Sequence, residues 1–230
     1  MSKKIRIFLC IAFTGMCLHL HAQDRGDDNW GAWYMYFGTN KISEKWSIHT
    51  EAQFRFYEIT SNFNQLLLRT GVNYHISPKA IATLGYGFID TDTDFMDQPG
   101  EEKLKEHRIF EQFILKNNLG KFAFEHRYRF EQRFLHRYDE SETQHRARYR
   151  LQITYPLGTH WFLNAYDEIF INLQEPVFGQ NRLYGAVGYK VNKDLSFQFG
   201  YLKNHFTGIN FDRLQLAVFF NTDFLVKNNK

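Results

Sequence analysis

Apolar and polar side chains alternate through residues 121–155, and this is the strongest pattern in the chain. In residues 122–134 most even positions are aromatic, whereas the odd positions carry alanine, glutamate and arginine. In residues 145–155 the odd positions are mostly apolar, and the even positions are arginine, glutamine or threonine. Because successive side chains of a strand point to opposite faces, the pattern predicts two long strands, each with an apolar face and a charged face.

The presence of one apolar and one charged face on each strand indicates the fold class. The apolar faces are too long for an ordinary hairpin in water, and the charged faces are too rich in arginine for a protein core. A closed barrel in a membrane accommodates both, since its apolar side faces lipid and its polar side faces the lumen. We therefore predict an all-β protein, an antiparallel transmembrane up-and-down β-barrel of about 10–12 strands. The alternative is a soluble β-sandwich or a lipocalin-like barrel, in which the apolar face points inward.

Similar alternation recurs along the rest of the chain. It predicts further strands over residues 30–39, 46–58, 63–76, 80–90, 106–116, 161–172, 181–191, 195–202 and 211–222. With the two strands above this makes eleven segments, whereas bacterial single-chain barrels normally have an even number of strands. Either residues 30–39 do not form a full wall strand, or one strand escapes detection.

Short polar turns alternate with longer polar segments between the predicted strands. The longer segments include residues 91–105, 135–141 and 204–210. This alternation predicts short periplasmic turns at one end of the barrel and longer outer loops at the other. Aromatic residues near the short-turn ends predict one girdle, made of Trp46, Tyr74, Phe122, Tyr155, Trp161 and Tyr189.

The first 23 residues have the three parts of a secretory signal. Three basic residues precede an apolar stretch over residues 7–20, and the small residue Ala22 lies near the end. The apolar stretch is short for a spanning helix, which needs roughly 20 residues. We predict a cleaved signal peptide over residues 1–23 and one outer-membrane barrel domain over residues 24–230. An N-terminal membrane anchor is the alternative.

Composition and charge narrow the function classes. Aromatic residues make up 18% of the chain and charged residues 23%, as expected of a barrel in which only alternate residues meet lipid. Removal of the signal would lower Lys+Arg from 28 to 25, which equals the 25 Asp+Glu. The formal charge then falls from +3 to 0, so a nucleic-acid partner is not implied. Removal would also take Cys10 and Cys17, which leaves no disulfide and no thiol catalysis.

Several strand segments resemble a known family. They are WSIHTEAQFRFYE at residues 46–58, NQLLLRTGVNY at 64–74, HRYRFEQRF at 126–134, RARYRLQITYPL at 146–157 and QNRLYGAVGYKVNKDL at 180–195. On these segments the chain resembles an uncharacterised outer-membrane barrel family of Gram-negative bacteria, catalogued as domain of unknown function 2490. The resemblance covers nearly all of the mature chain and implies an outer-membrane location. The family has no assigned reaction, so the resemblance supplies no active-site residues.

Arginine is concentrated on the charged faces of the two strands in residues 121–155. An arginine facing lipid at the bilayer midplane would cost roughly 2–4 kcal/mol, so these side chains must face the lumen. The predicted lumen charge ladder comprises Glu51, Arg55, Arg69, Glu125, Arg127, Arg129, Glu131, Arg133, Arg146, Arg148, Arg150 and Glu168. Two interpretations stay open, an internal salt-bridge network and an anion path or anion-binding lumen.

The two arginine-rich strands must pair so that both charged faces share the lumen. Opposed residues of an antiparallel pair have a constant index sum, and the shared face requires this sum to be odd, as with 275 or 277. The first register opposes Arg129 to Arg146, and the second opposes Arg129 to Arg148. Because opposed like charges destabilise a strand pair, a negative group must lie near them. Carboxylates such as Glu168 or Glu51 are one source, and a bound or passing anion is the other.

Other candidate chemistry is weaker. His49 and His75 face the lumen on neighbouring predicted strands, but no histidine spacing forms a metal signature, so we expect no metal and no cofactor. The acidic residues of the 91–105 segment suggest a calcium site, although their spacing is not that of an EF-hand and a solvated loop is the simpler interpretation. No serine lies in a recognisable motif, so we predict no catalytic residue.

These observations favour a non-enzymatic, porin-like outer-membrane barrel. Its charged, narrow lumen binds or passes small polar or anionic solutes, or is structural. The alternatives are an outer-membrane enzyme acting on lipid and a scaffold for another envelope protein. Glu111, His126 and Gln132 interrupt the apolar faces and mark either a partner interface or an error in the predicted register. The expected partners are outer-membrane lipid and, during biogenesis, the barrel-assembly machinery.

Overall fold

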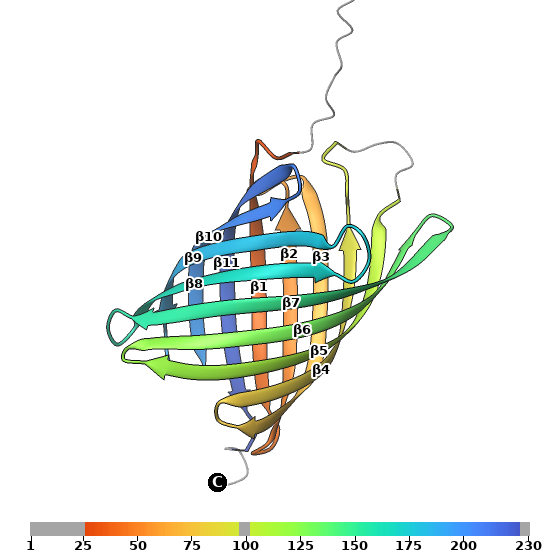
Figure 1. Cartoon of the computed structure of the whole chain (residues 1–230). Helices are drawn as coiled ribbons and strands as arrows, with labels where there is room; N and C mark the ends of the chain where they lie inside the picture. Colours follow the sequence, from red (N-terminus) through yellow and green to blue (C-terminus); the bar gives the residue numbers. More distant parts are fainter. Residues whose placement is uncertain (1–25, 97–101, 226–230) are drawn as a thin grey trace, which may run out of the picture.

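The computed structural model describes residues 26–96 and 102–225, which form a closed β-barrel (Figure 1). Its strands are β1 (Trp30–Lys41), β2 (Trp46–Phe56), β3 (Phe63–Ser77), β4 (Ala80–Thr91), β5 (Leu104–Leu119), β6 (Phe122–Arg137), β7 (Glu140–Pro156), β8 (Trp161–Asn172), β9 (Phe178–Lys190), β10 (Leu195–Phe206) and β11 (Ile209–Asp223). The predicted all-β barrel is therefore confirmed. Among the described residues there is no helix that is long and apolar enough to cross a membrane.

The ring closes through a parallel pairing of β1 and β11, in which Trp30 faces Asp212 and Lys41 faces Asp223. Residues 30–39 thus belong to a full wall strand. The other strand pairings are antiparallel. An up-and-down chain with an odd number of strands brings its first and last strands to the seam in the same direction. The parallel seam is therefore a consequence of the strand number, and it is where the barrel departs from the predicted antiparallel pattern.

The two ends of the barrel differ in their connections. At the turn end, the strands are joined by residues 42–45, 78–79, 120–121, 157–160 and 191–194. At the loop end, they are joined by residues 57–62, 92–103, 138–139, 173–177 and 207–208. The predicted loops over residues 135–141 and 204–210 are therefore wrong, because the strands continue into two-residue turns. Tyr138 and Gly208, with φ angles of 50° and 76°, take the left-handed conformation that such tight hairpin turns use.

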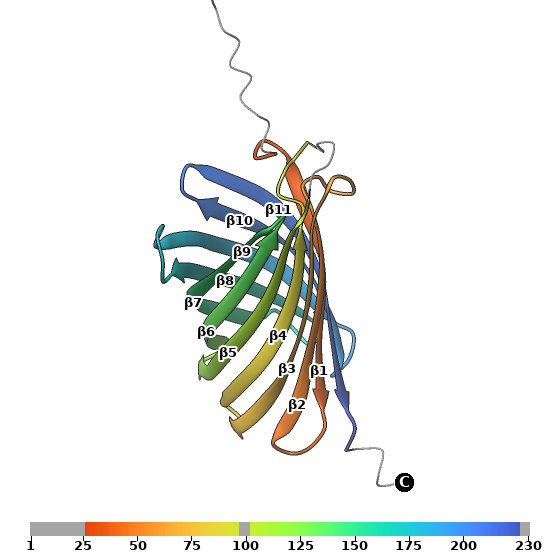
Figure 2. The same ribbon diagram turned by 90° about the vertical axis from the view of Figure 1, so that its right-hand side faces the viewer.

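The barrel is strongly twisted, and its two walls cross. In Figure 1, β1, β2 and β3 run steeply through one wall, whereas β6, β7 and β8 run across the other. Figure 2, turned by 90°, shows the same fan of strand directions from β1 to β10. β1 begins at the loop end and β11 finishes at the turn end, so the described chain enters and leaves at opposite ends.

Side chains alternate between an apolar outer face and a packed interior. On the outer face, Leu84 and Leu183 are 60% and 54% exposed, whereas the interior residues Phe110 and Leu202 are 0% exposed. The six predicted girdle residues form three cross-strand ring pairs near the turn end. Their ring centroids are 4.8 Å apart for Trp46 and Tyr74, 4.9 Å for Phe122 and Tyr155, and 4.8 Å for Trp161 and Tyr189.

Interior aromatic rings are seated over glycines of neighbouring strands. A Cβ atom added at Gly85 would lie 2.2 Å from Cζ of Phe110, and one added at Gly188 would lie 2.1 Å from Cζ of Phe162. Glycine therefore makes room for large rings inside a small barrel. Near the seam, Trp33 of β1 packs with Tyr184 of β9 and Leu202 of β10, so side chains fill the interior at this level.

Candidate functional site in the barrel interior

All twelve predicted ladder residues are placed on the inner face of the barrel. Arg55, Arg69, Arg129, Arg146 and Arg148 are each less than 9% exposed. The observed register of β6 and β7 opposes Arg129 to Arg148, Arg127 to Arg150 and Glu131 to Arg146. This is the register with index sum 277, so directly opposed arginines are present as expected.

Four further charged residues of the interior were missed by reasoning from the sequence: Glu106 and Arg108 on β5, Arg182 on β9 and Arg213 on β11. In β5 the alternation of polar and apolar residues is interrupted, because the apolar Phe110 lies on the inner face and the charged Glu111 lies on the outer face. The pattern therefore did not identify Glu106 and Arg108 as interior residues. Arg213 could have been found, because the outward positions predicted for β11 imply that residue 213 points inward.

Glu131 is the central carboxylate of the ladder and is 0% exposed. Its Oε2 accepts hydrogen bonds from Nε and Nη2 of Arg146 at 2.9 and 2.6 Å. Its Oε1 accepts one from Nη1 of Arg148 at 2.7 Å and lies 3.5 Å from Nη1 of Arg108. Glu131 therefore neutralises arginines from both adjoining strands.

Glu168 of β8 is the second carboxylate that binds more than one arginine. Its Oε1 accepts hydrogen bonds from Nη2 of Arg127 at 2.6 Å and from Nε and Nη2 of Arg148 at 3.0 and 2.7 Å. Glu168 thus supplies the negative charge that the sequence required near the opposed arginines. Glu51, the other carboxylate proposed for this role, instead pairs with Arg69 at 2.7 Å.

The remaining interior carboxylates are also shared with arginine. Glu106 accepts hydrogen bonds from Nε of Arg108 at 2.6 Å and from Nε and Nη2 of Arg133, both at 2.9 Å. Glu125 accepts one from Nη2 of Arg150 at 2.7 Å. We call Glu131, Glu168 and the arginines that hydrogen-bond them at 3.0 Å or less, Arg127, Arg146 and Arg148, the paired cluster.

Other interior arginines lie against rings and amides instead of carboxylates. The guanidinium carbon of Arg55 is 3.8 Å from the centroid of Trp33, and that of Arg182 is 4.8 Å from the same ring. Arg55 donates hydrogen bonds to Gln53 and Gln65. Among the described residues neither arginine has a carboxylate oxygen within 4.0 Å. We call Arg55, Arg182 and Trp33 the unpaired cluster.

The interior has an excess of positive charge. Between the two rims the inward-facing arginines are Arg55, Arg69, Arg108, Arg127, Arg129, Arg133, Arg146, Arg148, Arg150, Arg182 and Arg213. The inward-facing carboxylates there are Glu51, Glu106, Glu125, Glu131 and Glu168. Eleven guanidinium groups therefore face five carboxylates in the described interior.

The loop end is covered in part by residues 57–62 and 92–96. The hydroxyl of Tyr57 donates to the backbone carbonyls of Asp92 and Thr93 at 3.2 and 3.0 Å. Burial, with the nearby Asp92 carboxylate, raises the pKa of Tyr57 to about 12. Phe95 packs on Tyr57 with ring centroids 5.6 Å apart. These contacts hold two connections together over the mouth of the barrel.

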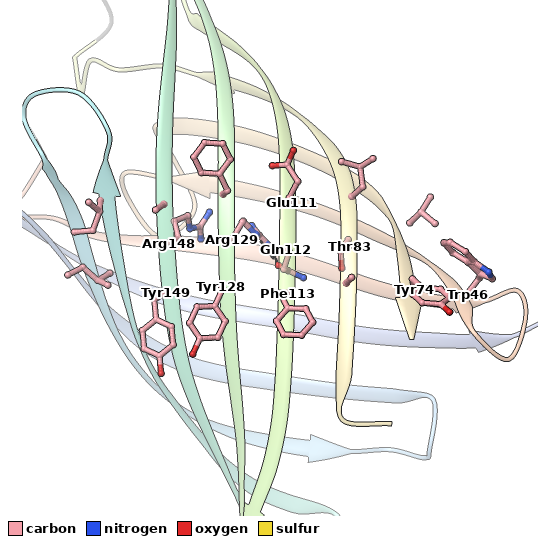
Figure 3. Close-up of a pocket in the computed structure, with 17 residues that line it drawn as sticks. Trp46, Tyr74, Thr83, Glu111, Gln112, Phe113, Tyr128, Arg129, Arg148 and Tyr149 are labelled. Atoms are coloured by element: carbon pink, nitrogen blue, oxygen red, sulfur yellow. Dashed lines mark hydrogen bonds between the residues drawn. The ribbon is translucent and has the colours of Figure 1, made fainter. Parts of the chain in front are cut away.

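The outer wall carries an apolar depression of about 910 Å³ across β2 to β8 (Figure 3). Phe113, Tyr128 and Tyr149 line it in a row, while Arg129 and Arg148 of the same strands turn inward. Glu111 is the charged outer-face residue among its lining residues. His126 and Gln132 also belong to the outer face, and Nδ1 of His126 lies 2.9 Å from the Tyr149 hydroxyl. The predicted faces were therefore assigned in the correct register.

Within the described part of the chain, the histidines and acidic residues form no group that could hold a metal ion. His49 lies 3.0 Å from Glu51, and His75 lies 2.8 Å from the Ser47 hydroxyl. His49 faces Gly71 in the register, four residues before His75 on β3, so the two histidines are not opposed. In residues 26–96 and 102–225 no three metal-ligating side chains come together. Part of the proposed calcium loop, residues 97–101, and the predicted signal lie outside the described residues.

Comparison with known proteins adds one finding. A family model described as "Protein of unknown function (DUF2490)" matches residues 30–215. The match begins at the first residue of β1 and extends into β11, so it includes every interior charge named above between the rims. A search of curated proteins gives no match.

Proposed function

Because the chain belongs to the family described as "Protein of unknown function (DUF2490)", which assigns no activity, we propose a function from the barrel itself. The protein is a non-enzymatic outer-membrane barrel whose arginine-rich interior binds or passes small anionic solutes. The observation that carries this proposal is the excess of eleven arginines over five glutamates in the interior.

The outer wall supports a membrane location. The strands contain 11 to 17 residues, and a tilted strand needs about 9–11 residues to cross the hydrocarbon core. Exposed leucine and aromatic side chains cover the wall, and an apolar surface of this extent is unfavourable in water. The ring pairs at the turn end suit the interface between lipid and water.

The interior supports an anionic solute. Each carboxylate is already shared by two basic side chains or more, so within the described barrel the eleven guanidinium groups exceed the five carboxylates by six charges. A buried charge is stable only when it is paired or hydrogen-bonded. Small anions supply that charge, whereas cations are repelled by the same interior. The filled section around Trp33 favours a narrow path over a wide aqueous pore.

Cell fractionation and labelling test the location. The mature protein is expected in the outer-membrane fraction with its N-terminus near residue 24, and an intact Met1 would contradict the predicted signal. Spin labels on the outer face should be accessible to oxygen within the bilayer at positions 124, 128, 130, 149, 151 and 153. Accessibility to water-soluble reagents alone would show that the outer wall does not face lipid.

Reversal potentials in a planar bilayer test the solute class. Under a salt gradient we expect anion preference for the wild type and a weaker preference for Arg129→Glu. This substitution should permit assembly, because residue 129 directly opposes Arg148 and the new carboxylate gains a partner there. Lys193→Glu makes the same charge change in a turn-end connection and should keep the preference. Equal cation and anion permeability in wild type would contradict the proposal.

A further inference from the structure

Every connection at the turn end of the barrel carries a basic side chain. Four of the five contain a lysine and the fifth ends in a histidine: Lys45, Lys79, Lys121, Lys193 and His160. The same connections contain two carboxylates, those of Glu44 and Asp194. Because the strands form a closed barrel, the five connections follow one another around its rim. We call the four lysines the turn-end lysines.

The turn-end lysines are exposed and have no fixed counter-charge in the described chain. The ion pairs that lysines form at this end are those of Lys41 with Asp223 and of Lys116 with Glu125. No carboxylate oxygen of the described residues lies within 4.0 Å of a turn-end lysine. The charge of these four side chains is therefore available to a partner outside the chain.

The connections at the loop end carry the opposite charge. Their described residues include one lysine, Lys103. They also include six carboxylates, those of Glu58, Asp92, Asp94, Glu102, Asp139 and Glu175. The two rims of the barrel therefore differ in sign. An anionic surface is attracted to the turn end and repelled by the loop end.

Three of the turn-end connections finish with a cation that directly precedes a ring of the aromatic girdle. The pairs are Lys45 with Trp46, Lys121 with Phe122, and His160 with Trp161. The three rings are 44%, 45% and 54% exposed on the outer face. Such rings favour the boundary between hydrocarbon and headgroups, so cations one residue farther out lie at the level of the lipid phosphates. A soluble acidic protein would need the lysines but not the rings, so the arrangement favours a membrane surface.

The apolar depression of the outer wall adjoins this girdle. Trp46 and Tyr74, which form one of the girdle pairs, also line the depression (Figure 3). Lys45 directly precedes Trp46 and lies beyond it at the turn end. The depression therefore offers space for the acyl chains of a lipid whose headgroup lies beside Lys45.

We propose that the turn-end lysines bind the headgroups of anionic glycerophospholipids, so that lipids of this charge gather around the turn end and not around the loop end. The proposal goes beyond the proposed function and rests on its membrane location, but not on its solute. The connections are spread around the rim, so each lysine contacts the phosphate of a different lipid and no common pocket is required. The long lysine stem lets the ammonium group reach a phosphate at the membrane surface.

Quenching of tryptophan fluorescence by brominated lipid tests the two ends separately. Full-length mature protein is placed in phosphatidylcholine vesicles that contain either brominated phosphatidylglycerol or brominated phosphatidylcholine. In a Trp30→Phe background the exposed tryptophans are Trp46 and Trp161 at the turn end. Their relative association constant should favour phosphatidylglycerol by about fivefold. A Trp46→Phe, Trp161→Phe double variant leaves Trp30 at the loop end and should show no preference for the anionic lipid.

Substitution of the turn-end lysines tests whether their charge causes the preference. In the Trp30→Phe background, the combined changes Lys45→Gln, Lys79→Gln, Lys121→Gln and Lys193→Gln should reduce the preference to within about twofold. Arginine at the same four positions keeps the charge and should retain the preference. None of the four lysines forms an ion pair in the described chain, so both variants should assemble. In about 1 M sodium chloride the preference should also fall, because the Debye length shortens to about 3 Å.

The outcomes distinguish this inference from the proposed function. Absence of quenching by either brominated lipid would show that the outer wall does not meet lipid, and would overturn both. Equal quenching by the two lipids at Trp46 and Trp161 would overturn the lipid preference and leave the membrane barrel standing. A preference that survives all four glutamine substitutions would show that the lysines do not cause it. An equal preference at Trp30 would overturn the assignment to the turn end.

Discussion

The paired cluster and the unpaired cluster contain the same cation in opposite electrostatic settings. In the paired cluster, Glu131 and Glu168 lie between arginines from neighbouring strands at 2.6 to 2.7 Å. In the unpaired cluster, Arg55 and Arg182 lie against Trp33 with no carboxylate within ion-pair distance in the described chain. In the proposed function, arginine is structural where a carboxylate holds it, and the arginines that lie against a ring are the ones proposed to bind an anion.

This difference follows from where the chain places its glutamates. The interior glutamates lie on β2, β5, β6 and β8, and the paired cluster is built across β6, β7 and β8, which follow one another in the barrel wall. The strands around the seam contribute Arg182 and Arg213 to the interior but no glutamate between the rims. An anion in the unpaired cluster would complete the charge balance that the chain itself leaves incomplete.

The largest expected effect is in the paired cluster. Glu131→Gln removes the charge that holds Arg146 and Arg148 and leaves buried cations uncompensated. We expect the free energy of unfolding in detergent to fall by about 3–5 kcal/mol, or assembly to fail. The control Glu142→Gln changes an exposed residue of β7 and should alter stability by less than about 0.5 kcal/mol. Equal effects would show that the paired cluster is not structural.

A smaller effect is expected where interior rings pack over glycines, outside both clusters. Gly85→Ala and Gly188→Ala each force a Cβ into an interior ring, of Phe110 in the first case and Phe162 in the second. Overpacking of this kind destabilises by about 1–3 kcal/mol. Gly185→Ala meets no atom within 4 Å and is the matched control. If chemical denaturation gives these two variants losses no larger than that of Gly185→Ala, close packing of the rings on the glycines does not contribute to stability as proposed.

The smallest effect should be at the rim. Lys41 and Asp223 form an ion pair at 3.6 Å between half-exposed side chains. Solvent screens this pair, so Lys41→Gln should change the free energy of unfolding by less than about 1 kcal/mol. A loss as large as that of Glu131→Gln in the same denaturation experiment would mean that burial does not set the strength of the ion pairs in this barrel.

Alternation identified the inner and outer faces of β6 and β7 because each face there is chemically uniform. It could not assign β1, where aromatic residues point both ways: Trp33 lies inside and Trp30 outside. The unpaired cluster could therefore not be predicted from the sequence, because its ring, Trp33, belongs to the strand with the least regular alternation.

The choice of carboxylate partners was also beyond the sequence. Glu168 and Glu51 both qualified as counter-charges for the opposed arginines, but only the strand order and register decide between them. Glu168 directly faces Arg150 and reaches Arg148, whereas Glu51 directly faces Arg69 and is used there. Alternation shows which charged residues face the interior. Which glutamate pairs with which arginine depends on the strand order and register of the closed barrel.

The most direct test compares one substitution in the two clusters. Arg148→Gln and Arg182→Gln remove the same charge from neighbouring parts of the interior, and their unfolding free energies should be measured side by side in low-salt, phosphate-free detergent. We predict a loss of about 3–5 kcal/mol for Arg148→Gln, because Glu131 and Glu168 lose their shared partner, and a loss below about 1 kcal/mol for Arg182→Gln. Equal losses would contradict the division of the interior arginines into structural and anion-binding groups.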